Sequence, residues 1–264
     1  MKNILVPIGS SSNASNTLQY AIDLADTMDA NVYAISVFQE LSKVGGLSKV
    51  NSILREESEK KLSKVLSSVN HKNVSVIAHP IKGGIVEGVE RFNKHVHVDL
   101  MVLSPRSNSV RDEVYLGNTT GKLIKETNIA ALVVPEHVTF TNPTQILMAF
   151  KNGNFDKKRQ LEPLRKFQKN FGTDVHLLHV ETPDSTDSML QVSEDLERIK
   201  KSYKKTVNAT TYQGVLEHFQ SFNPDIICVV RRKRGFFKKL WEKNVVLKKE
   251  FFTSKPLLIL RVKH

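Results

Sequence analysis

The run Ile4-Leu5-Val6-Pro7-Ile8 opens the chain, and Ile146-Leu147-Met148-Ala149-Phe150 echoes it near the middle. Both runs are almost entirely apolar, which is typical of a parallel strand whose two faces are covered by helices. A helix-like stretch follows each run, at Thr17–Met28 in the first half and at Arg159–Phe171 in the second. Self-similarity on this scale predicts a tandem duplication of one domain.

The later parts of the two halves match as well. Val98–Leu103 matches Pro224–Val229, and Ala130–Val134 matches Pro256–Leu260. Each half therefore alternates five strands with helices, which predicts an α/β fold of two tandem doubly wound parallel-sheet domains with the strand order 3-2-1-4-5. We expect the domains at residues 1–139 and 143–264. The short linker Val138–Gln145 suggests that they pack together as an internal pseudo-dimer.

The boundaries of the first half follow from hydrophobic periodicity. Strands are predicted near residues 3–8, 31–38, 73–79, 98–104 and 131–134. Helices are predicted near residues 14–29, 48–69, 84–95 and 118–127.

Composition restricts the class of protein. The 264 residues are 40% hydrophobic and 25% charged, as in ordinary globular proteins. The longest apolar runs are far shorter than the roughly 20 residues needed to span a bilayer. The first residues lead directly into a strand without a signal-peptide pattern, so a cytoplasmic location is expected. The single cysteine, Cys228, excludes an intramolecular disulfide.

The net charge of +12 is unevenly distributed. Residues 1–139 carry 15 Lys/Arg against 14 Asp/Glu, whereas residues 140–264 carry 24 against 13. A polyanion is therefore a candidate partner of the second half alone.

A ligand site is expected where doubly wound sheets bind ligands, beyond the carboxyl ends of the first and fourth strands. In the first half this places the loops Gly9–Asn13 and Ser104–Leu116 side by side, followed by a helix that opens with Gly117–Thr120. Free N–H groups and the helix dipole at such a start can hold phosphate. The alternative is that Asn118 or Thr119 only caps the helix.

The opening strand, the strand at 98–103, the loop that ends in Gly117-Asn118 and the closing Ala131–Pro135 together resemble the universal stress protein family. The resemblance covers both halves. Many members bind ATP through two glycines three residues apart, then nine residues, then a glycine followed by Ser or Thr. Here that spacing falls on Ser104, Ser107, Gly117 and Asn118, so one of three glycines is kept.

The departures from the family pattern predict weakened ATP binding in the first domain. Serine in place of a close-approach glycine costs about 1–2 kcal/mol of strain, and a lost hydrogen bond to phosphate costs roughly 1.5–3 kcal/mol. The family's acidic residue after the first strand would fall at Gly9. Serine hydroxyls and Arg106 can recover part of the loss. The candidate nucleotide-binding residues are Gly9, Ser104, Arg106, Ser107, Gly117, Asn118, Thr119 and Thr120.

The second domain is expected not to bind ATP, which leaves ATP as a candidate cofactor of the first domain only. The corresponding glycine positions hold Val230, Lys233 and Lys243, and Lys151 replaces the acidic residue. A basic aromatic segment stands in the same place, with candidate partner residues Arg231, Arg232, Arg234, Lys238, Lys239 and Trp241. Its aromatic residues either pack on the neighbouring domain or a second chain, or help to bind a polyanion or an acidic membrane.

No catalytic or metal-binding motif stands out. His176 and His179 are expected on opposite faces of one strand, and no nucleophile elbow or complete phosphate-binding loop occurs. Together with this absence, the resemblance to universal stress proteins implies a non-catalytic stress-response protein that binds an unidentified protein partner and can associate further into a homodimer. The alternatives are an ATP-binding or weakly ATP-hydrolysing switch in the first domain, and a polyanion or acidic-surface binder through residues 231–243. Nucleic acid and membrane partners are disfavoured.

Overall fold

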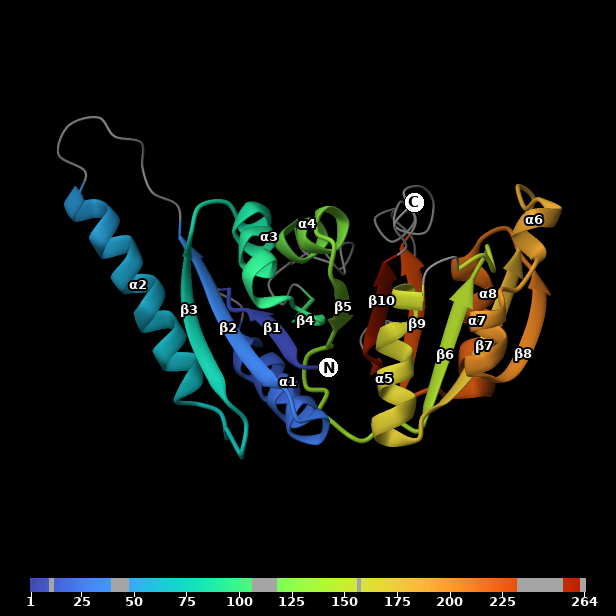
Figure 1. Cartoon of the computed structure of the whole chain (residues 1–264), viewed down its shortest axis with the longest axis horizontal. Coiled ribbons are helices and arrows are strands. Elements are labelled where there is room, and N and C mark those ends of the chain that lie inside the picture. The colour runs from blue at the N-terminus through green and yellow to red at the C-terminus, as the bar shows by residue number, and fades with distance from the viewer. Residues whose placement is uncertain (10–11, 39–47, 106–117, 156–157, 232–253, 262–264) are drawn as a thin grey trace. The chain divides into compact units, whose positions relative to one another are not determined.

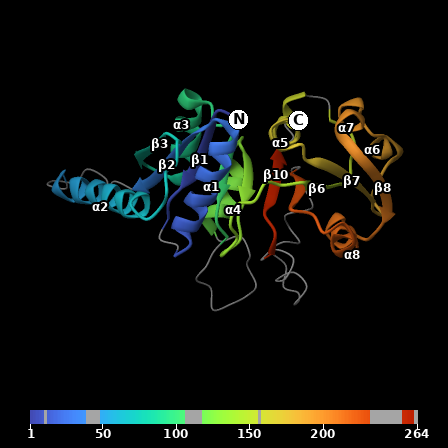
Figure 2. The same ribbon diagram turned by 90° about the horizontal axis from the view of Figure 1, so that it is seen from below.

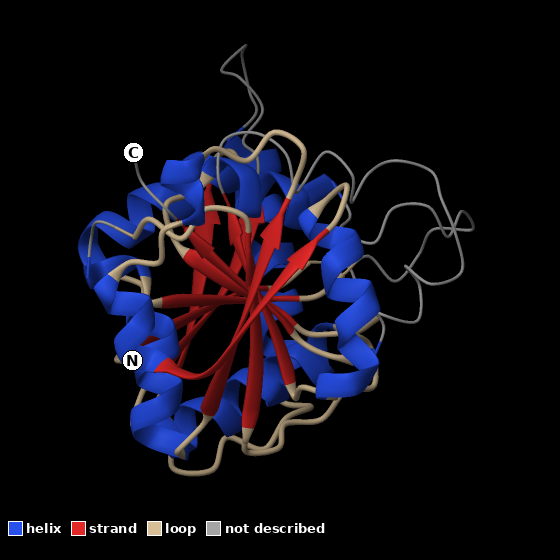
Figure 3. Ribbon diagram, turned by 90° about the vertical axis from the view of Figure 1, so that its right-hand side faces the viewer, coloured by secondary structure: helices blue, strands red, loops and turns tan. Residues whose placement is uncertain are grey.

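The computed structural model describes all residues except 10–11, 39–47, 106–117, 156–157, 232–253 and 262–264. The chain forms two compact units, and the described part of the first ends at Phe140, before the second begins at Thr141. Each unit is a parallel sheet flanked by helices (Figures 1 and 3).

The first unit has the predicted architecture. Its strands are β1 (Asn3–Pro7), β2 (Asn31–Phe38), β3 (Val76–Lys82), β4 (Leu100–Leu103) and β5 (Ala130–Val133). They pair in parallel in the order β3-β2-β1-β4-β5, which confirms the predicted 3-2-1-4-5 order. The described helices are α1 (Ala14–Met28), α2 (Ser48–Leu66), α3 (Ile85–Val96) and α4 (Asn118–Glu126). Figure 2 shows α1 and α2 along this sheet.

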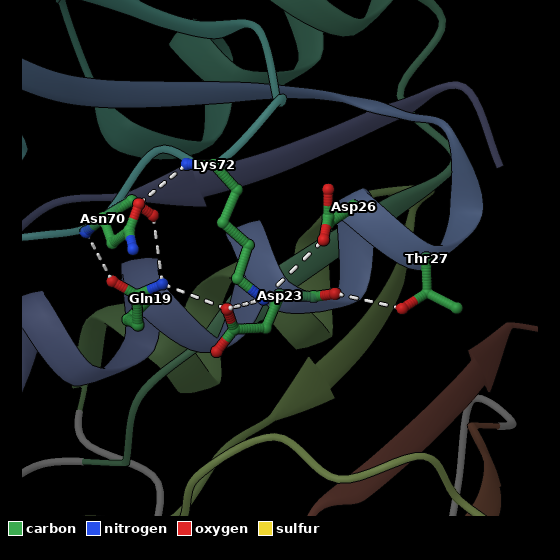
Figure 4. A network of polar contacts seen from close by, with 6 residues as sticks. All are labelled: Gln19, Asp23, Asp26, Thr27, Asn70 and Lys72. Atoms are coloured by element: carbon green, nitrogen blue, oxygen red, sulfur yellow. Dashed lines mark hydrogen bonds and ion pairs between the residues drawn. The ribbon is translucent and has the colours of Figure 1, made fainter.

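One strand lies later than predicted: β3 begins at Val76 rather than near residue 73. The preceding segment is bound to α1 instead (Figure 4). Asn70 N–H donates to Gln19 Oε1 at 2.7 Å, and Lys72 Nζ lies 2.8 Å from Asp23 Oδ1 and 3.7 Å from an oxygen of Asp26. These contacts hold residues 70–72 against α1, and Val74 N–H donates to His71 O at 3.0 Å, so the chain is still turning at residues 71–74 and β3 begins only after this turn.

The second unit repeats the topology. Its strands are β6 (Gln145–Phe150), β7 (Asp174–Glu181), β8 (Lys200–Val207), β9 (Ile226–Arg231) and β10 (Leu257–Arg261). They pair in parallel in the order β10-β9-β6-β7-β8, which is the strand order of the first unit read from its other edge. The described helices are η1 (Lys158–Gln160), α5 (Glu162–Phe171), α6 (Asp187–Leu190), α7 (Glu194–Ile199) and α8 (Thr211–Phe222).

The two units differ most between their second and third strands. In the first unit this connection contains α2, a helix of 19 residues, whereas in the second it contains α6 and α7, of four and six residues. The middle section of the second unit therefore has less helix than that of the first.

An aspartate at the same repeat position ties each sheet together. Asp99 Oδ2 accepts hydrogen bonds from the N–H groups of Lys2, at 2.6 Å, and Asn3, at 3.1 Å. Asp225 Oδ2 accepts from the N–H groups of Thr144, at 2.7 Å, and Gln145, at 3.0 Å. Each carboxylate thus fixes the start of the first strand of its unit to the start of the fourth.

The core confirms that the central strands are covered on both faces. The side chains of Ile4, Leu5 and Val6 are fully buried, as are those of Ile146 and Leu147. Within the described ranges, no helix has the length and apolar character needed to cross a membrane.

Candidate functional site

The carboxyl end of β1 leaves open space beside its backbone. Gly9 follows β1 and is exposed, and a Cβ atom at this position would have no heavy atom of the described residues within 4 Å, its two chain neighbours aside. The strand end itself is fixed, because Ile8 N–H donates to Ile35 O at 2.7 Å. This combination provides a rigid edge with room beside it.

The end of β4 and the start of α4 are joined by a side chain. Thr120 Oγ1 donates to Ser104 O at 2.8 Å, so the first turn of α4 is held beside the end of β4. Thr119, its neighbour, is exposed, and Asn118 is the first residue of α4. The hydroxyl proton of Thr120 is already donated to protein, whereas the N–H groups of the first helical turn lack intrahelical acceptors.

A glycine turn lies at the same end of the sheet. Gly83 has φ +109° and donates its N–H to Phe38 O at 2.9 Å, and α3 starts two residues later, as predicted. Such a backbone angle strongly favours glycine.

Several predicted site residues lie outside the described part of the chain. In the first unit these are Arg106, Ser107 and Gly117, and in the second they are Arg232, Arg234, Lys238, Lys239 and Trp241. Arg231 is the last residue of β9 and is half-buried. Ten of the 24 basic residues of the second half, but only three of its 13 acidic ones, fall outside the described ranges. Most of its excess positive charge is therefore located there.

The equivalent place in the second unit is occupied by the protein itself. Lys151 follows β6, and its Nζ lies 2.5 Å from an oxygen of Asp184. Thr182 Oγ1 donates to the same carboxylate at 2.7 Å. These hydrogen bonds, that of Lys151 above all, lower the pKa of Asp184 to about 2. Lys151 is thus paired with a carboxylate of its own unit, that of Asp184.

Backbone contacts close this place further. Gly153 N–H donates to Met189 O at 3.0 Å, and Ser193 N–H donates to Gly153 O at 3.1 Å. A Cβ atom at Gly153 would lie 2.1 Å from Gln191 O. The segment Thr182–Ser193, called here the covering segment, therefore packs directly against the loop after β6.

His179 binds the backbone of the loop after β6 at Lys151. Its side chain is fully buried, with Nε2 3.1 Å from Lys151 O and Nδ1 2.9 Å from Tyr203 Oη. Because a carbonyl can only accept, Nε2 carries the proton and Nδ1 accepts from the tyrosine. Burial lowers the pKa of His179, so the ring is neutral at pH 7.

The two histidines of β7 face opposite sides, as predicted. His176 Nδ1 lies 2.7 Å from Ser202 Oγ, and its ring packs near Phe222 of α8. Sequence reasoning identified Lys151 but missed Asp184, Gly153 and His179 as parts of one arrangement. The sequence features that could have indicated these residues are the turn-forming stretches Asn152-Gly153-Asn154 and Thr182-Pro183-Asp184.

The strand order and the alternation of strands and helices define a tandem α/β protein with two doubly wound parallel sheets. Residues 1–135 match the family model described as the universal stress protein family, and the chain belongs to that family.

A curated relative and two solved structures are similar to this chain. A universal stress protein of Methanocaldococcus jannaschii is 26% identical over 138 residues, which cover 50% of this chain and 81% of the relative. A solved universal stress protein of Archaeoglobus fulgidus is 16% identical, with a TM-score of 0.66 over 98% of this chain and 96% of its own. A putative universal stress protein of Pseudomonas aeruginosa is 13% identical, with a TM-score of 0.57 over 99% of this chain and 93% of its own. At such identities, the two structural likenesses show the fold alone.

Proposed function

We propose that this chain serves in the stress response by binding a protein partner without catalysis, and that a nucleotide binds only in its first unit. The observation that carries the second part is the contrast between Gly9, which has open space beside it, and Gly153, which is covered. A ligand needs such space at the carboxyl ends of the strands.

The residue types in the loops after β1 and β4 support nucleotide binding rather than nucleotide hydrolysis. The described candidate residues Gly9, Ser104, Asn118, Thr119 and Thr120 offer backbone and neutral polar groups. Hydrolysis of ATP needs a group that orients water and one that holds the metal near the phosphates. None of these five residues has a titratable side chain suited to either task.

Nucleotide binding is known from one solved relative, a universal stress protein in complex with cAMP. For the present chain, the loss of two family glycines predicts ATP affinity well below that of a complete phosphate loop. Each missing interaction with the phosphates is worth about 1.4 kcal/mol, which corresponds to a tenfold change in affinity. Two or three such losses weaken ATP binding roughly 100- to 1000-fold, and we expect a dissociation constant in the millimolar range.

Isothermal titration calorimetry with ATP and Mg²⁺ tests the nucleotide part. We expect one weak site per chain, abolished by Gly9→Trp, whose side chain would fill the open space. Gly9→Ala is the matched control and should bind as the unmodified protein does. Two sites per chain, or a site that survives Gly9→Trp, would contradict the assignment to the first unit.

The non-catalytic part is tested by measuring ADP release from ATP at the same concentrations. We expect no release above that of buffer. Release that disappears in Gly9→Trp but persists in Gly9→Ala would identify the alternative function, a weak ATPase switch.

A further inference from the structure

The last strands of the two sheets leave backbone groups unpaired on one side. β3 ends the first sheet and β8 ends the second, and within the described residues no strand lies beyond either. Along a parallel strand, the N–H and C=O of one residue point to one neighbour and those of the next residue point away from it. Every second residue of β3 and β8 therefore presents its backbone groups outward.

On β3 this outward edge is closed. Val32 N–H donates to Ser75 O at 2.9 Å, which directs the odd-numbered residues of β3 toward β2 and the even-numbered ones outward. Pro80 is even-numbered and has no N–H, and Lys82 O accepts a hydrogen bond from Arg91 at 2.5 Å. Proline on an edge strand prevents a further strand from pairing.

On β8 the outward edge is open. Asn208 N–H donates to Glu181 O at 2.9 Å, so the outward groups belong to the odd-numbered Tyr203, Lys205 and Val207. None of these is proline. Among the described residues, no hydrogen bond reaches their N–H or C=O groups. Figure 1 shows β8, in orange, with β7 on one side.

The side chains of this edge supply apolar contact. Tyr203 and Val207 lie on the same face of β8 and are 39% and 74% exposed, which places them among the few exposed large hydrophobic residues of the described chain. The hydrogen bond of Tyr203 to His179 fixes the tyrosine ring in place. An added strand with apolar residues at alternate positions would cover both side chains.

The positive charge of β8 favours an acidic partner strand over a second copy of β8. The strand carries Lys200, Lys201, Lys204 and Lys205 within eight residues. Three of these lysines form ion pairs, with Glu197, Asp174 and Glu181, but such exposed pairs contribute little and exchange readily. A second copy of β8 would bring four more ammonium groups and be repelled, whereas an acidic strand would be attracted.

We propose that the open edge of β8 binds an extended acidic segment of a partner protein, which adds to the second sheet as a further strand. This inference rests on the partner-binding part of the proposed function and names its surface. The backbone of the added strand pairs with Tyr203, Lys205 and Val207. Its apolar side chains cover the face of β8 that holds Tyr203 and Val207, and its acidic side chains lie on the other face, beside Lys200 and Lys204.

Fluorescence anisotropy with the full chain tests the proposal. The probe is a labelled eight-residue peptide of alternating glutamate and valine. Two matched peptides accompany it: one in which lysine replaces glutamate, and one in which the glutamate–valine backbone is N-methylated at every residue. We expect saturable binding of the first peptide, none of the lysine peptide, and roughly tenfold weaker binding of the N-methylated one, because its donors to the edge are blocked.

Substitutions in β8 separate backbone pairing from charge. Because the N–H of Val207 points away from β7, Val207→Pro removes a donor to the added strand and none to β7. It should weaken binding of the acidic peptide about five- to tenfold. Val207→Thr keeps the N–H and should stay within about twofold. The double substitution Lys204→Gln and Lys205→Gln should lower affinity and flatten its dependence on salt.

Four results would overturn the proposal. Equal binding of the N-methylated peptide would show charge attraction without strand addition, and this test does not depend on the folding of any variant. Self-association in sedimentation velocity that Val207→Pro abolishes would identify a second copy as the occupant. Displacement of the peptide by oligothymidylate at lower concentration than by unlabelled peptide would identify a polyanion site. Lack of saturable binding up to about 1 mM peptide would remove the site altogether.

The ATP titration of Gly9→Trp is independent of all four results, so failure of either proposal is recognisable.

Discussion

The loop after β1 and the loop after β6 occupy equivalent places in two repeats, yet only the first leaves room beside its backbone. Among the described residues, a Cβ atom at Gly9 would meet nothing within 4 Å. A Cβ atom at Gly153, two positions after Lys151, which is the residue equivalent to Gly9, would lie 2.1 Å from Gln191 O. The sheets, their order and their tying aspartates are the same. The two repeats therefore share their strand order, while the connection between the second and third strands decides whether there is room beside the end of the first strand.

The largest expected difference between the two loops is in their tolerance of a side chain. Gly153→Val places methyl groups against backbone atoms that cannot rotate away, and should cost about 3 kcal/mol or more of unfolding free energy. Gly9→Val is the matched control and should cost less than about 1 kcal/mol. Urea unfolding followed by circular dichroism measures both. Equal losses would mean that the two loops are equally packed.

The next prediction concerns the support under the covered loop. His179→Phe keeps an aromatic ring but leaves Lys151 O and the Tyr203 hydroxyl without their partner, at a cost of roughly 1–3 kcal/mol. His176→Phe, on the opposite face of β7, loses a single side-chain contact, with the half-buried Ser202, and should cost less. If the two variants unfold at the same urea concentration, His179 has no special role in the covered loop.

The same histidine gives the second unit a pH dependence. Burial lowers the pKa of His179 below its ordinary value near 6.5, so the unfolded chain binds a proton at a higher pH than the folded chain does. Stability is therefore complete above about pH 6.5 and is lost as the pH falls from there through the folded-state pKa. Urea unfolding at a series of pH values should show this loss in the unmodified protein and a smaller slope in His179→Phe. A slope that is unchanged in the variant would assign the effect to other groups.

A smaller effect is expected in the open site. Thr120→Val removes the hydrogen bond to Ser104 O at nearly constant volume and should cost about 0.5–1.5 kcal/mol. Thr119→Val alters the exposed neighbouring residue and should stay within about 0.5 kcal/mol. Comparison of their thermal midpoints tests whether the Thr120 hydroxyl positions α4, and indistinguishable midpoints would show that it does not.

The smallest effect is expected from the ion pair that covers Lys151. Asp184 is 81% exposed in its side chain, so Asp184→Asn should cost less than about 1 kcal/mol despite the lowered pKa. That contribution should be present above about pH 4 and fade as the pH falls toward about 2, where the carboxylate of the folded protein takes up its proton. A loss as large as that of Gly153→Val would mean that the salt bridge, rather than the backbone packing, holds the covering segment.

The sequence allowed the frame of both units to be predicted because their central strands are uninterrupted apolar runs with clear helical stretches between them. It misplaced β3 by three residues, since the bonds of Asn70 and Lys72 to α1 join positions about 50 residues apart and leave no periodic pattern. The substitution of Lys151 for an acidic residue was visible, and so was its bearing on ATP. Its pairing with Asp184 was not, because that contact depends on how a 12-residue segment without a regular repeat folds back.

Asp99 and Asp225 also bear on the order in which the chain acquires its structure. Their bonds to Lys2 and Thr144 join residues 97 and 81 positions apart. Contacts between such distant positions form late, because a long loop has to close before they yield any stabilisation. During synthesis, which proceeds from the N-terminus, β1 has to wait for β4 before its second side is paired. The first unit can complete this closure while most of the second is still to be made, so we expect each repeat to fold around its own aspartate in turn.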